Sequence, residues 1–121
     1  MRLLELSLRN FRNYEEENFR FEPGVNLIVG NNAQGKTNLL EAIGYLGSGK
    51  SFRAMKSNEM VRFGAEFADI CGKVTSQERQ QELRYLLFAG SRPRQIYRNG
   101  VKKKTAKTKI ANLKNLVFIN V

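Results

Sequence analysis

Hydrophobic and polar residues alternate with a period of two near the N-terminus, which is typical of β-strands. Leucines alternate with polar side chains over residues 3–9, so this segment is predicted to be a half-buried strand. Phenylalanines alternate with polar residues over 18–22 and predict a second strand, which the Pro23-Gly24 turn signal follows. The nearly continuous apolar run over 25–29 predicts a strand that is buried on both faces.

The period then changes to that of a helix and later returns to two. Apolar residues with helical spacing over 36–46 predict a helix packed on a sheet, followed by a loop over 47–53. Residues 57–63 are predicted to form a short helix with Ser57 as its N-cap. The later strands are predicted at residues 66–75, 82–88, 94–98 and 116–119.

A turn signal lies between two extended runs in the C-terminal third. Asn99-Gly100 predicts a two-residue hairpin, because a type I′ turn needs a positive φ at both central residues. Residues 105–114 do not favour one structure, and a short helix is one alternative. Without internal repeats or a low-complexity linker, residues 1–121 are interpreted as one domain.

Composition narrows the possible classes of protein. The 121 residues are 41% hydrophobic and 26% charged, which is typical of a folded domain. No apolar stretch approaches the roughly 20 residues of a membrane span, and the N-terminus lacks the apolar core of a signal peptide. The single cysteine, Cys71, indicates a reducing compartment, so we expect a cytoplasmic protein. The absence of histidine excludes Ser-His-Asp catalysis and histidine metal ligands within the chain.

The net charge of +10 belongs entirely to the C-terminal third. Residues 1–82 contain 11 basic and 11 acidic residues, whereas residues 83–121 contain 10 basic residues and no acidic one. This asymmetry predicts a polyanionic partner such as a nucleic acid. One alternative is a solvated basic edge that protects a sheet against aggregation, and another, acidic lipid, is disfavoured because the segment lacks the pattern of an amphipathic helix. The residues around the predicted hairpin are expected to contact DNA phosphates without reading bases. They are Arg98, Lys102, Lys103, Lys104, Lys107 and Lys109.

A phosphate-binding motif lies between the predicted buried strand and the predicted helix. Residues 30–37 match G-x-x-x-x-G-K-[ST], in which backbone N–H groups surround the β-phosphate of a nucleotide. Lys36 is expected to reach the β- and γ-phosphates, and the Thr37 hydroxyl to ligate Mg²⁺. The helix predicted to start at Lys36 adds its positive dipole end. The strand–loop–helix context favours a nucleotide site over an ordinary glycine turn.

The same pattern occurs a second time, at residues 44–51, in a different context. It begins inside the predicted helix, and no strand precedes it. We interpret it as a helix C-terminus, with Gly47 or Gly49 as the left-handed stop, rather than as a second phosphate loop. Lys50 and Arg53 remain candidates to approach a nucleotide or DNA.

P-loop hydrolases also use an acidic residue at the end of an apolar strand to hold Mg²⁺ and to position water. No such run follows the motif in this sequence. Asp69 is the only aspartate and lies in the middle of an alternating strand, where it is expected to face solvent. We therefore expect this chain to bind nucleotide without hydrolysing it.

Three short segments support a family resemblance: residues 10–14 (NFRNY), 38–43 (NLLEAI) and 50–53 (KSFR). Together they resemble the N-terminal part of the RecF family, ABC-type ATPases related to SMC proteins, over the chain from Met1 to about Phe118. The resemblance implies an α/β (α+β-like) fold, which is lobe I of an ABC-type P-loop ATPase head with a mixed sheet and an antiparallel β-subdomain. Family members are much longer and carry their Walker B and signature motifs beyond this stretch, so we expect an N-terminal fragment.

The resemblance also implies a site and a function. Arg12 lies where such heads place a basic residue near the nucleotide. Family members bind ATP and Mg²⁺, form homodimers around nucleotide, and act at DNA gaps with RecO and RecR to load the recombinase in repair, replication and the SOS response. The alternatives are another P-loop enzyme such as a kinase, and a DNA-binding module that is independent of nucleotide. The implied nucleotide contacts are Gly30, Asn31, Asn32, Ala33, Gln34, Gly35, Lys36, Thr37 and Asn38.

Overall fold

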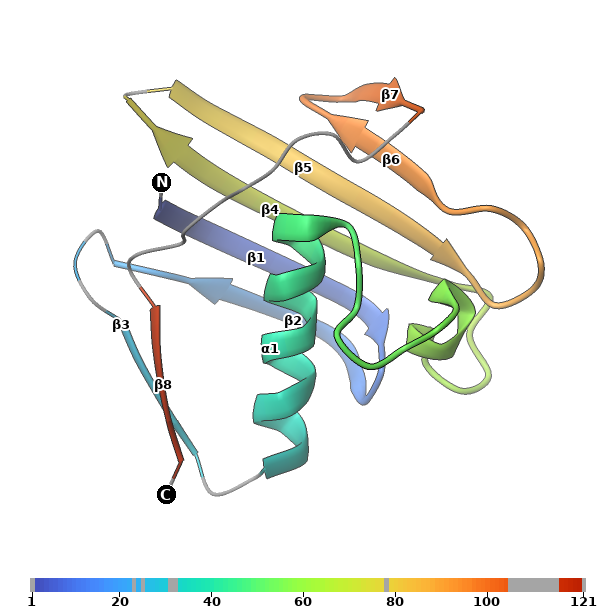
Figure 1. The fold of residues 1–121 in the computed structure, drawn as a ribbon, viewed down its shortest axis with the longest axis horizontal. Coiled ribbons are helices and arrows are strands. Elements are labelled where there is room, and N and C mark those ends of the chain that lie inside the picture. The colour runs from blue at the N-terminus through green and yellow to red at the C-terminus, as the bar shows by residue number, and fades with distance from the viewer. Residues whose placement is uncertain are drawn as a thin grey trace.

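The computed structural model describes residues 2–22, 24, 26–30, 33–77, 79–104 and 116–120, which form two sheets and one long helix (Figure 1). This is the mixed α/β architecture that the sequence predicts. In chain order the elements are β1 (Arg2–Phe11), β2 (Tyr14–Arg20), β3 (Asn26–Gly30), α1 (Ala33–Ser48), the 3-10 helix η1 (Ser57–Met60), β4 (Phe67–Ser76), β5 (Arg79–Phe88), β6 (Gln95–Arg98), β7 (Val101–Lys103) and β8 (Leu116–Asn120).

The large sheet has six antiparallel strands in the order β2-β1-β4-β5-β6-β7. Leu6 and Leu8 of β1 are buried in the core, as their alternation predicts. A bulge shifts the pairing of β1 with β4 between Leu3 and Glu5. Leu3 is therefore fully buried and Leu4 only half-buried, which simple alternation does not predict.

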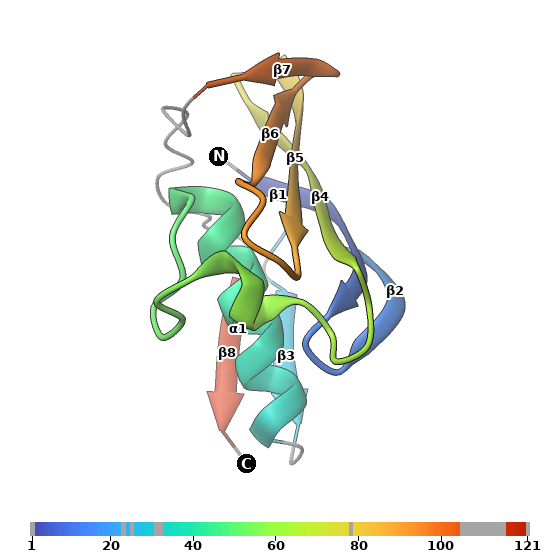
Figure 2. The same cartoon turned by 90° about the vertical axis from the view of Figure 1, so that its right-hand side faces the viewer.

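Helix α1 lies against one face of the large sheet (Figures 1 and 2). Between residues 35 and 48 its exposed positions are Leu40, Gly44 and Ser48, a single narrow stripe four residues apart. On the buried side, Leu46 packs directly onto Gly72 of β4, where a Cβ atom would overlap the leucine side chain. Glycine at this position of the strand lets the helix approach the sheet closely.

The small sheet consists of β3 and β8, which run parallel and pair from Asn26 with Leu116 to Gly30 with Asn120. It lies beside α1, and its carboxyl edge is at the end where α1 begins (Figure 1). In open α/β sheets, ligands bind outside the carboxyl ends of the strands. A ligand-binding site is therefore expected at this edge of the small sheet.

The turn chemistry read from the sequence is confirmed at two places. Asn99 and Gly100 have φ angles of 51° and 80°, and Arg98 pairs with Val101 across the two-residue turn. At the end of α1, Gly49 has a φ of 73° and its N–H donates to the Tyr45 carbonyl at 2.7 Å. The second copy of the motif is thus a helix C-terminus with a left-handed stop.

The predicted helix boundaries differ from the observed ones. Helix α1 begins at Ala33 rather than at Lys36, because the last residues of the phosphate motif already have helical backbone. The segment predicted as a helix over 57–63 is the 3-10 turn η1, and Ser57 lies within it rather than capping it. The N–H of Lys56 donates instead to the Glu59 carboxylate at 2.6 Å. Residues 105–114 lie outside the described residues.

None of the helices in the described part of the chain is both long and apolar enough to cross a membrane.

Candidate functional site

The phosphate motif connects β3 to α1 at the carboxyl edge of the small sheet. Strand β3 ends at Gly30 and α1 begins at Ala33, while Asn31 and Asn32 lie outside the described residues. No acidic residue occupies the first turn of α1, so the positive end of the helix dipole is not neutralised by its own turn. Such a strand–turn–helix arrangement favours the binding of anionic groups.

The first turn of α1 is held in place by β2. The Tyr14 hydroxyl donates a hydrogen bond to the Gly35 carbonyl oxygen at 2.8 Å. Burial raises the pKa of Tyr14, which keeps this hydroxyl a donor. Gly35 is buried, and Lys36 and Thr37 are half-buried. The two side chains assigned to phosphate and Mg²⁺ therefore project from a fixed backbone.

Asn38, directly after Thr37, is almost inaccessible, with 2% of its surface exposed. Its Nδ2 donates to Oδ1 of Asn13 at 2.6 Å, and its Oδ1 accepts a hydrogen bond from Arg53. The amide thus connects the turn between β1 and β2 with the segment that follows α1. Its predicted place beside a nucleotide stays a prediction.

A fully buried carboxylate, Glu41, lies one helical turn beyond Thr37. Arg12 donates to it twice, from Nε at 2.8 Å and from Nη2 at 2.9 Å. Nη2 of Arg53 donates at 3.0 Å and the Ser51 hydroxyl at 2.6 Å. Three side chains from two other segments thus pair the buried charge. We call Arg12, Glu41, Ser51 and Arg53 the Glu41 cluster.

The electrostatics of the cluster favour the ionised carboxylate. Burial alone would raise the pKa of Glu41, but the hydrogen bonds from Arg12, Arg53 and Ser51 outweigh it and lower that pKa to about 2. The hydrogen bond to Glu41 in turn raises the pKa of Arg12. Both groups are therefore charged at neutral pH.

Sequence reasoning selected Arg12 and the 50–53 segment but gave Glu41 no role. The structure brings these parts together on Glu41. A signal was present in the sequence, because a charged residue between Leu39 and Ala42 in the buried part of a helix requires a partner. The contact of Arg12 with a nucleotide stays a prediction.

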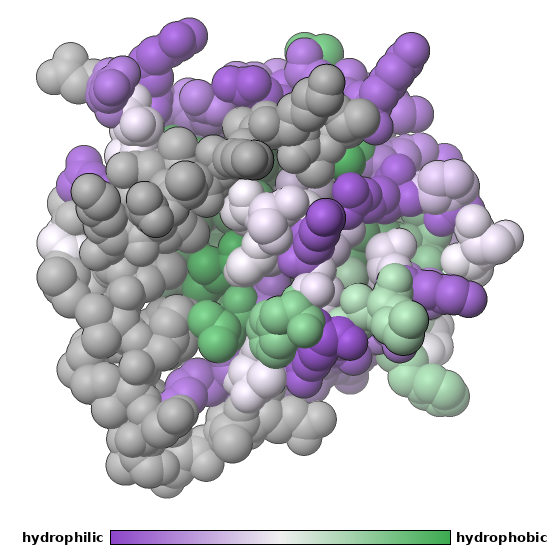
Figure 3. Space-filling model, viewed as in Figure 1, coloured by the Kyte–Doolittle hydropathy of each residue, from purple (hydrophilic) through white to green (hydrophobic). Residues whose placement is uncertain are grey.

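Four of the predicted DNA-contacting residues, Arg98, Lys102, Lys103 and Lys104, lie on the β6–β7 hairpin or directly after it, at the edge of the large sheet. Every residue of β7 is exposed, as is Lys104, and Arg98 is half-buried. Strongly hydrophilic side chains gather along this upper edge of the molecule (Figure 3). Lys107 and Lys109 lie outside the described residues.

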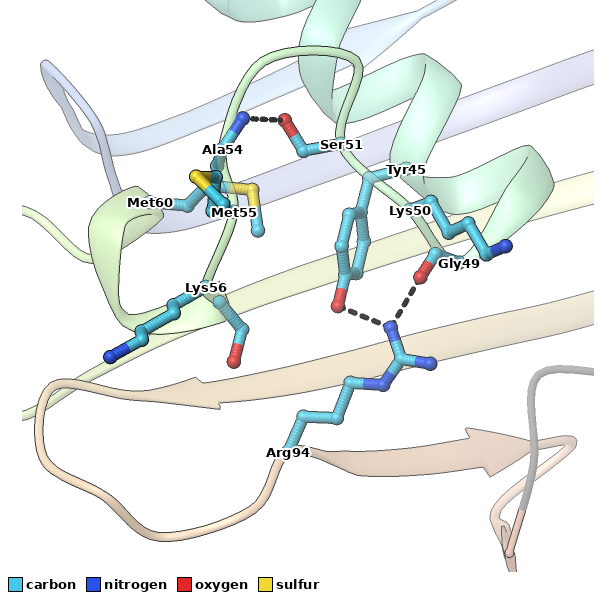
Figure 4. A pocket seen from close by; sticks show the side chains of 10 residues that line it. Tyr45, Gly49, Lys50, Ser51, Ala54, Met55, Lys56, Met60 and Arg94 are labelled. Carbon is cyan, nitrogen blue, oxygen red and sulfur yellow. Dashed lines mark hydrogen bonds between the residues drawn. The ribbon is translucent and has the colours of Figure 1, made fainter.

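A cavity of about 480 Å³ opens at the other end of α1 from the phosphate motif (Figure 4). Arg94 donates there to the Tyr45 hydroxyl at 2.6 Å and to the Gly49 carbonyl. Lys50 and Lys56 also line the cavity, but their ammonium groups point away from each other. The basic residues therefore do not converge on one anion.

Asp69 pairs with Arg84 on the neighbouring strand β5, with Nη2 to Oδ2 at 2.6 Å and Nε to Oδ1 at 3.0 Å. Only 13% of the Asp69 side chain is exposed. Asp69 lies on the face of β4 opposite to the buried Ala68 and Ile70, and Arg84, which is itself 45% exposed, covers most of its side chain there. Within the described residues, no group of three or more Asp, Glu, Cys or His side chains could hold a metal ion.

Comparison with known proteins adds to this geometry. Residues 5–120 match a family model described as an AAA domain. The chain is 42% identical over 106 residues to the DNA replication and repair protein RecF of Lactobacillus johnsonii, an alignment that covers 88% of this chain and 28% of that protein. The chain thus spans less than a third of that relative.

Two solved structures share the fold. One is described as the recombination mediator protein RecF-ATPrS in the RecFOR pathway, with 39% identity, a TM-score of 0.78, and coverage of 85% of this chain and 28% of that one. The other is an Smc head domain from Pyrococcus yayanosii, with 21% identity, a TM-score of 0.74, and coverage of 85% and 23%. The second likeness concerns the fold alone.

Proposed function

The chain belongs to the RecF family of AAA-domain ATPases, and from this premise we propose that it is the ATP-binding lobe of a protein of DNA repair and replication. The observation that carries the proposal is the path of the phosphate motif from the carboxyl end of β3 into the first turn of α1. The RecF structures that this chain resembles are described with ATP or ATPrS.

The donor groups of the motif suit a nucleoside triphosphate with Mg²⁺. Backbone N–H groups at the start of α1 and the Lys36 ammonium would hold the phosphates, and the Thr37 hydroxyl would ligate the metal. The absence of an acidic residue from the first turn of α1 and the hydrogen bond from Tyr14 to Gly35 favour this use. Bound Mg²⁺ would neutralise part of the triphosphate charge.

We propose that the chain binds ATP without hydrolysing it. Asp69 is the only aspartate of the sequence, and it lies in the antiparallel sheet, where it forms an ion pair with Arg84. A metal-holding acid of a P-loop hydrolase would be needed at the carboxyl edge of the small sheet instead. Dimerisation around nucleotide, action with RecO and RecR at DNA gaps, and a cytoplasmic location are proposed for the longer protein.

Calorimetric titration of the chain with Mg²⁺-ATP tests the proposed site. Lys36→Ala should abolish measurable binding while the far-UV circular dichroism spectrum stays that of the wild type. Lys50→Ala is the matched control, because it removes the lysine of the second copy of the motif. Equal affinities of Lys36→Ala and the wild type would refute the proposed site.

A second candidate activity, DNA binding through the β6–β7 hairpin, is favoured by the exposure of β7 and by the absence of acidic residues from 83–104. The double variant Lys102→Glu with Lys103→Glu should weaken DNA binding and flatten its dependence on salt. Lys56→Glu, at an exposed lysine away from the hairpin, is the control. DNA binding that is unchanged in the double variant would show that the hairpin does not contact DNA.

A further inference from the structure

The Glu41 cluster lies one helical turn from the proposed Mg²⁺ ligand Thr37. We infer that Glu41 is a positioning residue for nucleotide binding, which holds the guanidinium groups of Arg12 and Arg53 beside the phosphate loop. The inference rests on the proposed ATP site and assigns a role to a residue that would not itself touch the nucleotide.

The Glu41 carboxylate and its arginine partners differ in burial. The Glu41 side chain is fully buried, whereas the side chains of Arg12 and Arg53 are 24% and 35% exposed. Each guanidinium therefore hydrogen-bonds the carboxylate along one edge, while part of each arginine side chain stays accessible to solvent.

The two arginines of the Glu41 cluster have more N–H donors than the cluster uses. A guanidinium has five N–H groups, and Arg12 uses Nε and Nη2 for Glu41. Arg53 directs Nη2 at Glu41 and Asn38. Within the described residues, Nη1 of either arginine makes no hydrogen bond. Planar donors of this kind suit phosphate oxygens.

The backbone of Arg12 has a φ of 53°, which is uncommon for a residue other than glycine. The conformation is held at both ends, since the Arg12 N–H donates to the Met60 carbonyl at 2.9 Å and the side chain to Glu41. Because Phe11 pairs with Tyr14, this φ belongs to the two-residue turn between β1 and β2, and the turn together with these hydrogen bonds fixes the direction of the Arg12 side chain.

Hydrogen bonds of Arg53 connect the Glu41 cluster to the residue that follows the phosphate motif. Arg53 hydrogen-bonds both Glu41 and Asn38, and Asn38 follows Thr37 in the chain. Displacement of Arg53 would therefore change the surroundings of the residue next to the proposed metal ligand. A merely structural ion cluster is the competing interpretation.

The experiment measures the Mg²⁺-ATP dissociation constant and the melting temperature of Glu41→Gln, beside the wild type. The substitution removes the charge and keeps the size of the side chain. Asp69→Asn is the matched control, because Asp69 also accepts a bidentate Arg84 but lies in the large sheet. We expect Glu41→Gln to weaken binding by about tenfold or more, as loss of a supporting partner commonly does, and Asp69→Asn to leave the dissociation constant unchanged.

A structural role alone would lower the melting temperature of Glu41→Gln but not its affinity, and that result overturns the inference while the proposed function stands. Absence of binding by the wild-type chain overturns both.

If Glu41→Gln does not fold, Arg53→Lys replaces it, since this change keeps the charge and the Arg12–Glu41 pair. Weakened binding by Arg53→Lys supports the inference, and wild-type affinity overturns it.

Discussion

Two carboxylates of this protein each accept a bidentate arginine, yet they occupy very different surroundings. Glu41 is fully buried and receives hydrogen bonds from Arg12, Ser51 and Arg53, which come from segments on both sides of α1. Among the described residues, the carboxylate of Asp69 accepts side-chain hydrogen bonds from Arg84 alone, and Arg84 comes from a strand already paired with β4 through the backbone.

The difference shows what an ion pair can contribute to a fold. The Asp69–Arg84 pair adds little to an arrangement that the β4–β5 ladder already determines, and exposed pairs contribute about 0–1 kcal/mol. The Glu41 cluster connects parts that no ladder joins, and removal of one partner leaves an incompletely paired buried charge.

The largest expected effect is on global stability. Arg12→Ala should lower the free energy of unfolding by about 3 kcal/mol, because Glu41 remains buried without its bidentate partner. Arg84→Ala should cost about 1 kcal/mol or less. Urea denaturation followed by circular dichroism measures both, and equal losses would contradict the contrast.

The second largest expected effect is a loss of folding stability in acid, caused by protonation of Glu41. The folded-state pKa of Glu41 is lowered from 4.5 to about 2, so its contribution is complete above pH 4.5 and is lost as the pH falls toward 2. At about 1.4 kcal/mol per pKa unit, roughly 2 kcal/mol should disappear between pH 7 and pH 3. Denaturation curves at the two pH values measure this loss. Glu41→Gln should show a shallower dependence, and a dependence as steep as that of the wild type would assign the loss to other groups.

High salt should change the destabilisation caused by Arg84→Ala, relative to that caused by Arg12→Ala, by less than 1 kcal/mol. Screening at about 1 M salt acts on solvated charges, so the small cost of Arg84→Ala should shrink further. The cost of Arg12→Ala should persist, because water and ions do not reach Glu41. Repeating the denaturation series in NaCl provides the measurement, and parallel salt effects on both variants would argue against the contrast.

The smallest effect concerns Cys71, whose thiol reports on the Asp69 pair. Burial, followed by the charges of Glu82 and Asp69, raises the pKa of Cys71 to about 11, and Arg84 opposes this. Alkylation at pH 8.5 should therefore be slow in the wild type, somewhat faster in Asp69→Asn and slower in Arg84→Ala. The rate of iodoacetamide labelling tests the order, and identical rates would show that the pair does not act on the thiol.

Sequence alone predicted those features that depend on neighbouring residues. Asn99-Gly100 determines its own turn, and Gly49 ends α1, because each conformation requires only local positive φ. The strand–loop–helix context of the phosphate motif follows from periodicity in the same way.

Features that depend on distant segments could not be predicted in this way. The bulge that buries Leu3 arises from the register between β1 and β4, which alternation within β1 does not contain. Glu41 could be suspected only as a charge on a buried helix face, since its partners are 29, 12 and 10 residues away. Asp69 lies opposite Leu86 on β5, and the Arg84 that covers it comes from the diagonal position opposite Cys71, which the pattern within one strand does not contain.

The parallel pairing of β3 with β8 also has a consequence for the order in which the chain can mature. Strands β1 and β2 can form their hairpin as soon as Arg20 is available. In the described sheets β3 pairs only with β8, so the apolar strand that leads into the phosphate motif lacks a sheet partner until Leu116–Asn120 has been synthesised. Closing so long a loop is slow, and an unpaired apolar strand is prone to aggregation meanwhile. In a growing chain, the strand that leads into the phosphate motif therefore gains this sheet partner only when Leu116–Asn120 is present.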